Sequence, residues 1–373
     1  MKAFVESILR EEEGFSFGDP WSYKNSKGTI LPIRRKGRRR RKYRTLEEVL
    51  KDTKDAVEVT ETGSIRKVKI LNRTDIPIFV RMGTIFAGKG TQSRAAEGSV
   101  ILVPHTKARP LEVCCVEAAV PIRGGTRFDV AGFTAPHSVE MGLYSHDQEE
   151  VWERVSSYAR TRTAPGRRSR RGRESSAVMY RLAREHSLVD IVAAVETFKE
   201  QVDEVLEVVP NYEDQAGLVF LDQKGVLGME AFDMPKSWEA VSERIVKKYG
   251  DVISIPTGEE PIPSELDKDA IVGQAHRFLQ ALAVARGRVT FKESGHQTFA
   301  LTGKSLVGEY TTIDGDVMHL TGVRFERKPK KKGRMWPGDH PPRYTREELE
   351  REVPRARRDT HGRDREEGVR EGP

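Results

Sequence analysis

The chain has 373 residues, a length that can bury a full hydrophobic core in one domain or in two. No run approaches the roughly eighteen apolar residues that a membrane span needs, and the first residues, MKAFVESILREEEG, carry acids where a signal peptide needs an apolar stretch. We therefore expect a cytoplasmic protein with no membrane partner. The two cysteines are adjacent, which excludes an ordinary structural disulfide and fits a reducing compartment.

The formal net charge of +7 is concentrated in two arginine-rich segments. Residues 34–44 hold nine basic residues, residues 160–173 hold seven, and neither segment contains an acid. Concentrated arginine favours a polyanionic partner such as RNA, DNA or a phosphorylated metabolite. The alternative is that both segments are flexible, nonspecific loops. The predicted nucleic-acid contacts are Arg38, Arg39, Arg40 and Arg41 in the first segment and Arg167, Arg168, Arg170 and Arg171 in the second.

Residues 1–42 are interpreted as a basic N-terminal extension, and the organised domain is expected to run from residue 43 to residue 327. Its first part, residues 56–133, is predicted to be β-rich, because short β-like runs alternate there with turn signals. These runs are AVEVTET (56–62), IRKVKILNRT (65–74), IPIFVRM (76–82), SVILVPH (99–105) and RPLEVCCVEAAVPI (109–122).

A glycine-rich stretch lies between two of these runs. GTIFAGK, residues 83–89, has the G-x-x-x-x-G-K spacing of a phosphate-binding loop. Such a loop opens a sustained helix, whereas SVILVP at residues 99–104 reads as a strand, and the loop interior is bulky for a phosphate cradle. We therefore predict a strand, a glycine-rich turn that presents Lys89, Gln92 and Arg94, and a return strand.

Helices and β-hairpins are predicted from residue 150 to residue 327, apart from the arginine-rich loop 160–173. The last segment, residues 328–373, mixes both signs of charge, is almost free of apolar residues, and is predicted to be a disordered tail. The fold class is therefore α+β: a β-rich antiparallel N-terminal unit, then helices and hairpins, with charged flexible tails. Helices are predicted within 174–209, 234–250 and 264–287, and hairpins at 216–232 and 306–325.

Several blocks resemble, in order, the ARG and Rhodanese-Phosphatase-superfamily-associated protein domain family, first kind. The main block runs from ILNRTDIPIFV through GKGTQSR and ILVP to CCVE, residues 70–117, and later blocks are EEVWERV (149–155), residues 213–250 and residues 301–325. The family takes its name from neighbours, an ADP-ribosylglycohydrolase and a rhodanese-type phosphatase. The resemblance therefore implies a link to NAD or ADP-ribose metabolism.

The family pattern also implies site residues. Lys89, Gln92 and Arg94 match its glycine turn with K-Q-x-R, and Cys115 and Glu117 match its C-V-E tripeptide. The chain departs from the pattern in three ways. Its turn is longer, AAVPIRGG stands where an aromatic residue often follows C-V-E, and the second arginine-rich segment looks inserted.

A catalytic reading takes Cys115 as a nucleophile, with Glu117 and either His105 or His137 nearby. The alternative is that Cys115 is a small buried hydrophobic residue, as cysteines in apolar strands often are. Alternation along a strand points Cys115 and Glu117 to the same face, so a buried Glu117 needs a partner such as Arg94. The nine histidines are scattered without ligand spacing, so we expect no metal, and we expect no cofactor.

Two functions of different classes follow from these residues. The first is binding or processing of a nucleotide-like phosphorylated ligand, related to ADP-ribose, by the turn residues with Glu117 orienting them. The second is a nonenzymatic RNA- or DNA-associated protein that acts through its arginine-rich segments. Neither hypothesis defines a reaction or an oligomeric state.

Overall fold

The computed structural model describes residues 1–22, 28–37, 41–104, 107–117, 120–162, 187–197, 212–249 and 267–325. These residues belong to one unit that spans Met1–Arg327. No helix in these ranges is long and apolar enough to cross a membrane. The helices are α1 (Lys2–Leu9), α2 (Leu46–Asp52), α3 (His137–Leu143), α4 (Gln148–Arg162), α6 (Leu188–Thr197), α8 (Pro235–Lys248) and α10 (Lys268–Ala283).

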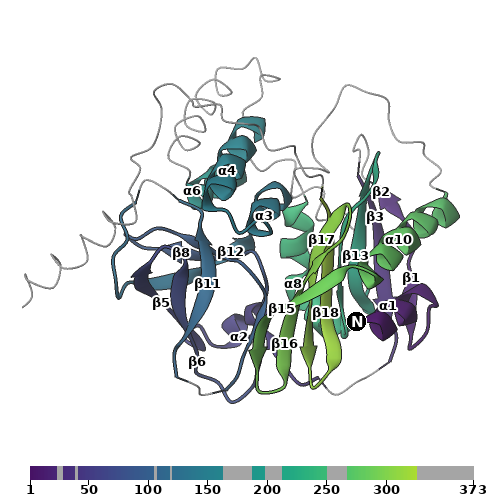
Figure 1. Cartoon of the computed structure of the whole chain (residues 1–373), viewed down its shortest axis with the longest axis horizontal. Coiled ribbons are helices and arrows are strands. Elements are labelled where there is room, and N and C mark those ends of the chain that lie inside the picture. The colour runs from purple at the N-terminus through teal and green to yellow at the C-terminus, as the bar shows by residue number, and fades with distance from the viewer. Residues whose placement is uncertain are drawn as a thin grey trace, which may run out of the picture. The chain divides into compact units, whose positions relative to one another are not determined.

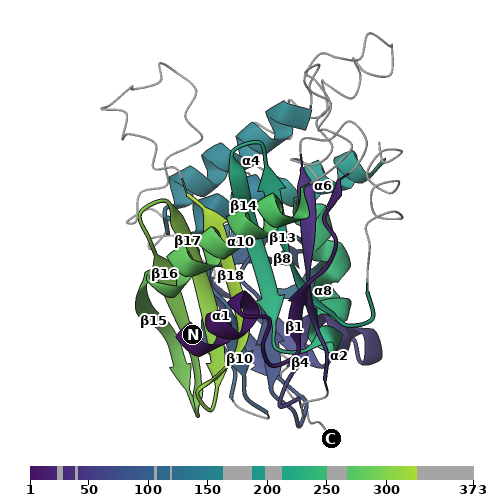
Figure 2. The ribbon, with the colours of Figure 1, turned by 90° about the vertical axis from the view of Figure 1, so that its right-hand side faces the viewer.

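A nine-stranded antiparallel sheet forms one half of this unit (Figure 1). Its strands lie in the order β1-β3-β13-β14-β18-β17-β16-β15, and β2 also pairs with β3. Helices α1 and α10 cover one face (Figure 2) and pack on it through apolar side chains, and α8 packs on the other face through Trp238 and Ile245. The strands are β1 (Phe15–Phe17), β2 (Trp21–Ser22), β3 (Thr29–Arg35), β13 (Gln215–Asp222), β14 (Gly225–Phe232), β15 (Arg286–Glu293), β16 (His296–Thr302), β17 (Leu306–Ile313) and β18 (Asp316–Arg324).

A closed barrel with the strand order β11-β6-β5-β12-β8-β9 forms the other half. Alternation gives each strand one inward face, filled by residues such as Val59, Phe86 and Val113. The outward faces of β8, β9, β11 and β12 pack on α3, α4 and α6. The strands are β5 (Val57–Ser64), β6 (Lys67–Asn72), β8 (Thr84–Gly88), β9 (Arg94–Ala96), β11 (Arg109–Cys115) and β12 (Arg127–Thr134).

A small sheet in the order β10-β7-β4 completes the β-structure, with β4 (Arg44–Thr45), β7 (Ile78–Val80) and β10 (Val100–Leu102). Strand β4 pairs with β7 in parallel, and β7 pairs with β10 antiparallel. Phe79 and Ile101 of this sheet pack in the same apolar cluster as α8 and the face of the large sheet that it covers. The small sheet therefore joins the barrel side of the fold to the nine-stranded sheet.

The glycine-rich stretch is a β-hairpin inside a larger β-hairpin. The predicted strand and return strand are β7 and β10, which pair directly. Between them, β8 pairs with β9 around the turn that contains Lys89 and Gln92, and this inner pair was not predicted. The bulky Ile85 and Phe86 lie on the two faces of β8, so they stabilise barrel packing where a phosphate-binding loop would need space.

The second half of the described chain confirms the predicted α+β order. The two hairpins are β13–β14 and β17–β18, the latter with its turn at Asp314 and Gly315, and α8 begins at Pro235 as predicted. Helix α10 begins after Asp267, whose side chain accepts a hydrogen bond from Ala270 N. Within 174–209 the structure describes residues 187–197, where α6 lies.

The first 42 residues contribute to the large sheet. Strand β3 lies between β1 and β13, and six of its seven residues are buried. The apolar run TILPI supplies this strand, although the basic residues that follow it dominate the composition of the segment. The proposed contacts Arg38, Arg39 and Arg40, most of the second arginine-rich segment, and the charged tail 328–373 lie outside the described residues.

Candidate functional site

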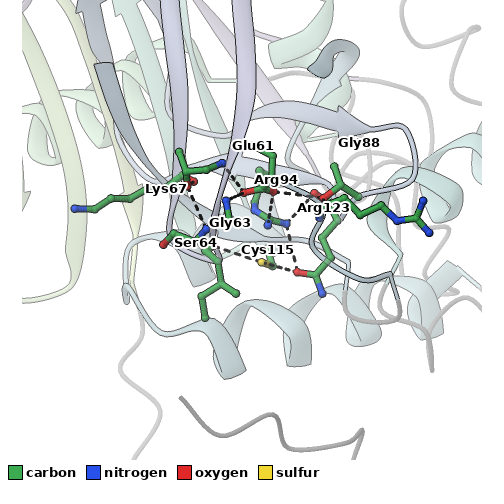
Figure 3. A network of polar contacts seen from close by, with 12 residues as sticks. Glu61, Gly63, Ser64, Lys67, Gly88, Arg94, Cys115 and Arg123 are labelled. Carbon is green, nitrogen blue, oxygen red and sulfur yellow. Dashed lines mark hydrogen bonds and ion pairs between the residues drawn. The ribbon is translucent and has the colours of Figure 1, made fainter. Parts of the chain in front are cut away.

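One end of the barrel interior is polar (Figure 3). Glu61 on β5, Arg94 on β9 and Cys115 on β11 share the inward face of their strands with apolar neighbours two residues away. The side chains of Arg94 and Glu61 are fully buried, and Arg94 Nη2 donates to Glu61 Oε2 over 2.8 Å. Glu61 Oε1 also accepts from the backbone N–H groups of Thr62 and Gly63. These contacts fix the arginine beneath the turn.

Gln92 joins the arginine to the cysteine. Arg94 Nη1 donates to the Gln92 carbonyl over 2.8 Å and to Gln92 Oε1 over 3.3 Å. Cys115 Sγ lies 3.1 Å from the same Oε1 and 3.4 Å from the carbonyl oxygen of Ile65, so the thiol has two acceptors within reach. Burial raises the pKa of Cys115 to about 11, which keeps the thiol protonated at neutral pH. In this geometry Cys115 is a hydrogen-bond donor.

Glu117 joins the same network through Ser93. Its Oε2 accepts from Ser93 N and Ser93 Oγ, each over 3.0 Å, and its Oε1 lies 3.3 Å from Ser187 Oγ, directly before α6. The sequence suggested Arg94 as the partner of Glu117, but Arg94 pairs with Glu61. The reason is that Glu117 lies beyond the end of β11, within reach of the turn backbone, whereas Arg94 points inward toward β5.

The tip of the turn faces solvent. The Lys89 side chain is 80% exposed, and its Nζ lies 2.7 Å from Asp129 Oδ2. Beside it, the backbone N–H of Arg123 donates to Thr91 Oγ1 over 3.1 Å, while the Arg123 side chain extends away from the network (Figure 3). The turn is therefore held by the buried network beneath it and by the Arg123 loop beside it, and it presents Lys89 to solvent.

The histidine proposed as a base for Cys115 lies elsewhere. His137 begins α3 and stacks on Tyr249 with ring centroids 5.0 Å apart, and burial lowers its pKa to about 3. His105 lies outside the described residues. In the ranges that the structure describes, no group of three or more His, Cys, Asp or Glu residues is placed to hold a metal ion.

Acids outside the first arginine-rich segment, both nearby and distant in the chain, form ion pairs with much of that segment. Arg41 makes a bidentate pair with Glu48, with distances of 2.7 and 2.8 Å, and Arg34 does the same with Asp214. Further pairs join Arg35 to Glu13, Lys42 to Asp314 and Arg44 to Asp52. The absence of acids within residues 34–44 therefore does not mean that these cations are unpaired in the fold. The predicted contacts Arg167, Arg168, Arg170 and Arg171 lie outside the described residues.

Two residues of the network, Glu61 and Ser93, were missed by sequence reasoning. Glu61 is a charge at an inward position of an alternating strand, after Val57 and Val59, and this pattern signals a buried ion pair. Ser93 had no comparable signal, because its role depends on the position of Glu117 in space. A second set of buried charges, around Arg81 and Glu230, was also missed.

Comparison with protein families gives one match. The model of the ARG and Rhodanese-Phosphatase-superfamily-associated Protein domain matches residues 14–323, most of the chain. No curated protein and no solved structure matches the chain.

Proposed function

This chain belongs to the ARG and Rhodanese-Phosphatase-superfamily-associated Protein domain family, and on that premise we propose that the turn 88–93 and the adjoining barrel end bind a nucleotide-like phosphorylated ligand. The observation that supports this proposal is that the glycine-rich turn and the C-V-E tripeptide, which are separate in the sequence, contact each other in the fold. Gln92 from the turn accepts hydrogen bonds from Arg94 and from Cys115 of the C-V-E tripeptide, which joins the two motifs in one network. A loop that is held this firmly is preorganised to present its exposed groups.

The proposed roles differ among the turn residues. Lys89 contacts the phosphate, because it is exposed and because exchanging its surface ion pair with Asp129 for a phosphate costs little. Arg94 is a positioning residue, since its guanidinium is engaged by Glu61 and Gln92 beneath the turn. Glu117 holds the turn backbone through Ser93 and completes the platform.

Binding fits the geometry better than covalent catalysis by Cys115. A nucleophilic cysteine reacts as the thiolate, and thiolates form where nearby cations or a base lower the thiol pKa. Burial raises the pKa of Cys115, and the glutamates Glu61 and Glu117 raise it further, against the charge of Arg94. The thiol therefore acts as a structural donor to Gln92 in this proposal.

Titration of the full chain with ADP-ribose, NAD and inorganic phosphate, followed by calorimetry and thermal unfolding, tests the proposal. Lys89→Ala should weaken nucleotide binding about tenfold, because a hydrogen bond to a charged group contributes on the order of 1.5 kcal/mol. Lys67→Ala is the matched control, since Lys67 is also an exposed lysine in a surface ion pair, but its side chain points away from the network (Figure 3). Saturable binding that both variants reduce equally, or no binding of any of the three ligands, would reject the proposal.

A further inference from the structure

A second cluster of charged side chains is buried where the large sheet, α3, α8 and the end of β7 meet. Arg81 follows β7, Glu140 lies in α3, Glu230 in β14, Lys248 ends α8, and His319 lies in β18. Each of these side chains is at most 3% exposed. Five ionisable groups at one buried place are costly to fold, because each charge gives up its hydration. Their position requires a physical explanation.

Glu230 is the centre of the cluster. Its carboxylate lies 3.2 Å from Arg81 Nη1, 3.3 Å from Lys248 Nζ and 3.1 Å from His319 Nε2. Lys248 Nζ also lies 2.9 Å from Glu140. Burial alone would raise the pKa of Glu230, but the charges of Arg81 and Lys248 hold it well below its usual value, so Glu230 is ionised. These contacts engage both acids, the lysine, one nitrogen of the histidine and one nitrogen of the arginine. His319 Nδ1 and Glu140 Oε2 are buried without a hydrogen-bond partner among the described residues, although Glu140 Oε2 is in ion-pair contact with Lys248.

Arg81 keeps two buried donors without a hydrogen-bond partner among the described residues, Nε and Nη2. Buried donors are almost always satisfied, and an unsatisfied charged donor is among the more expensive groups in a protein interior. The two nitrogens form one edge of the guanidinium, away from the Nη1 that meets Glu230. Arg34 uses the same edge to hold Asp214, with Nε to Oδ1 at 2.7 Å and Nη2 to Oδ2 at 2.9 Å.

We propose that Arg81 binds a small oxyanion, a phosphate or carboxylate group of a ligand, through Nε and Nη2. Both groups present two oxygens at the spacing of this guanidinium edge, which is why arginine binds them in a bidentate manner. Glu230 fixes the guanidinium from its other side, and Lys248 lies close by, with its charge shared between Glu140 and Glu230. This site lies on different elements from the turn 88–93 and does not depend on the function proposed for that turn.

Calorimetric titration of the full chain with sodium phosphate and, separately, sodium acetate tests the assignment, with sodium chloride at equal ionic strength as the reference. Arg81→Lys keeps the charge opposite Glu230 but removes the two-donor edge. It should weaken oxyanion binding at least about tenfold, because two charge-assisted hydrogen bonds are removed. Arg34→Lys is the matched control, since the same edge of Arg34 is engaged by Asp214, and it should bind as the wild type does. The phosphate and acetate arms distinguish the two chemical classes of ligand.

A measurement on the wild type covers the case in which Arg81→Lys does not fold. The Arg81 Nε–H group is buried, so its nitrogen-15 resonance should be observable and should move saturably as phosphate or acetate is added. Assignment compares this spectrum with those of Arg34→Lys, Arg41→Gln and Arg94→Met, each of which lacks one of the other firmly paired guanidinium groups. An Arg81 resonance that responds to neither anion, or equal affinity in wild type and Arg81→Lys, would show a purely structural network and overturn the proposal. Lys89→Ala should leave this response unchanged, which separates it from a failure of the turn site.

Discussion

At the residue scale, the fold depends on charges that are buried in pairs. Arg94 and Glu61 are both fully buried in the barrel, and their 2.8 Å contact compensates the loss of hydration of each. Such a pair is weak evidence for added stability, because an apolar pair of similar volume often does as well. Removing only one member is different, since the other charge then stays buried without its counterion.

We expect Arg94→Met to lower the free energy of unfolding by about 3 kcal/mol, the usual cost of breaking a buried ion pair on one side. The double variant Arg94→Met with Glu61→Leu should be more stable than Arg94→Met alone, because no buried charge is then left over. Arg127→Met is the control, since the Arg127 side chain is 68% exposed in its pair with Glu58, and it should cost less than about 1 kcal/mol. Urea unfolding of the four proteins measures these values. A double variant less stable than Arg94→Met would contradict the reasoning.

Glu309 on β17 is a buried acid of another kind. It accepts hydrogen bonds from Ser99 N and Ser99 Oγ, and its residue is 3% exposed. Burial raises its pKa from 4.5 to about 7, with the charges of Glu140 and Glu230 adding to the effect and the Ser99 hydrogen bonds opposing it. The folded state therefore binds the proton of Glu309 more tightly than the unfolded chain does.

A raised pKa in the folded state means that the stability contributed by Glu309 is complete below about pH 4.5 and is lost as the pH rises through about 7. At 1.36 kcal/mol for each unit of pKa, the loss is on the order of 3 kcal/mol. Glu309→Gln resembles the protonated acid and cannot ionise, so its free energy of unfolding should not fall in this way as the pH rises. Urea unfolding at about pH 5 and about pH 8 measures the difference between wild type and variant. Relative to the wild type, the variant should be more stable at about pH 8 than at about pH 5. Stability profiles with the same pH dependence in both proteins would exclude this role for Glu309.

At the element scale, the turn 88–93 depends on the close approach of its own backbone. A Cβ atom on Gly88 would lie 2.1 Å from the Thr91 carbonyl oxygen, so Gly88→Ala cannot be accommodated without moving the turn. Gly90 has a φ of +79° but open space around its Cα. We expect Gly88→Ala to cost about 2–3 kcal/mol by overpacking and Gly90→Ala only about 1 kcal/mol from backbone strain. Chemical denaturation of both variants tests this ordering, and a larger loss for Gly90→Ala would refute it.

Elements with a local signal were predictable from the sequence, and contacts between distant elements were not. Pro235 marks the start of α8, and apolar runs around a short turn mark the β13–β14 hairpin. Strands β8 and β9 were missed because a glycine-rich pattern obscured them. The partner of Arg94 was missed because Glu61 lies 33 residues earlier, and strand register alone brings the two together. Gln92, Arg94, Cys115 and Glu117 were singled out from the sequence as candidates, but their hydrogen-bond partners had to come from the structure.

At the scale of the whole molecule, ion pairs and hydrogen bonds connect the barrel side to the large sheet. Ser99 beside β10 holds Glu309 on β17, and Arg81 after β7 holds Glu230 on β14. The same contacts bear on the arginine-rich segments. An arginine that already pairs with an acid of the fold is not available to neutralise a phosphate of a nucleic acid. Arg41 forms an ion pair with Glu48, and the two side chains are only 13% and 9% exposed.

The proposed RNA- or DNA-binding role therefore divides the arginines into two groups with different expected effects. Neutralising Arg38, Arg39 and Arg40 together with Arg167, Arg168, Arg170 and Arg171 should weaken nucleic-acid binding and reduce the slope of log affinity against log salt by roughly 0.7 to 0.9 for each phosphate that the protein no longer neutralises. Arg41→Gln is the control: it should lower stability by breaking the pair with Glu48 and leave binding nearly unchanged. Filter binding of single-stranded RNA and duplex DNA at two salt concentrations decides the matter. Binding of a polyanion through arginine runs depends on counterion release, so removing these arginines must weaken it. Equal retention of nucleic acid by the wild type and the neutralised protein would therefore assign these segments no role in nucleic-acid binding.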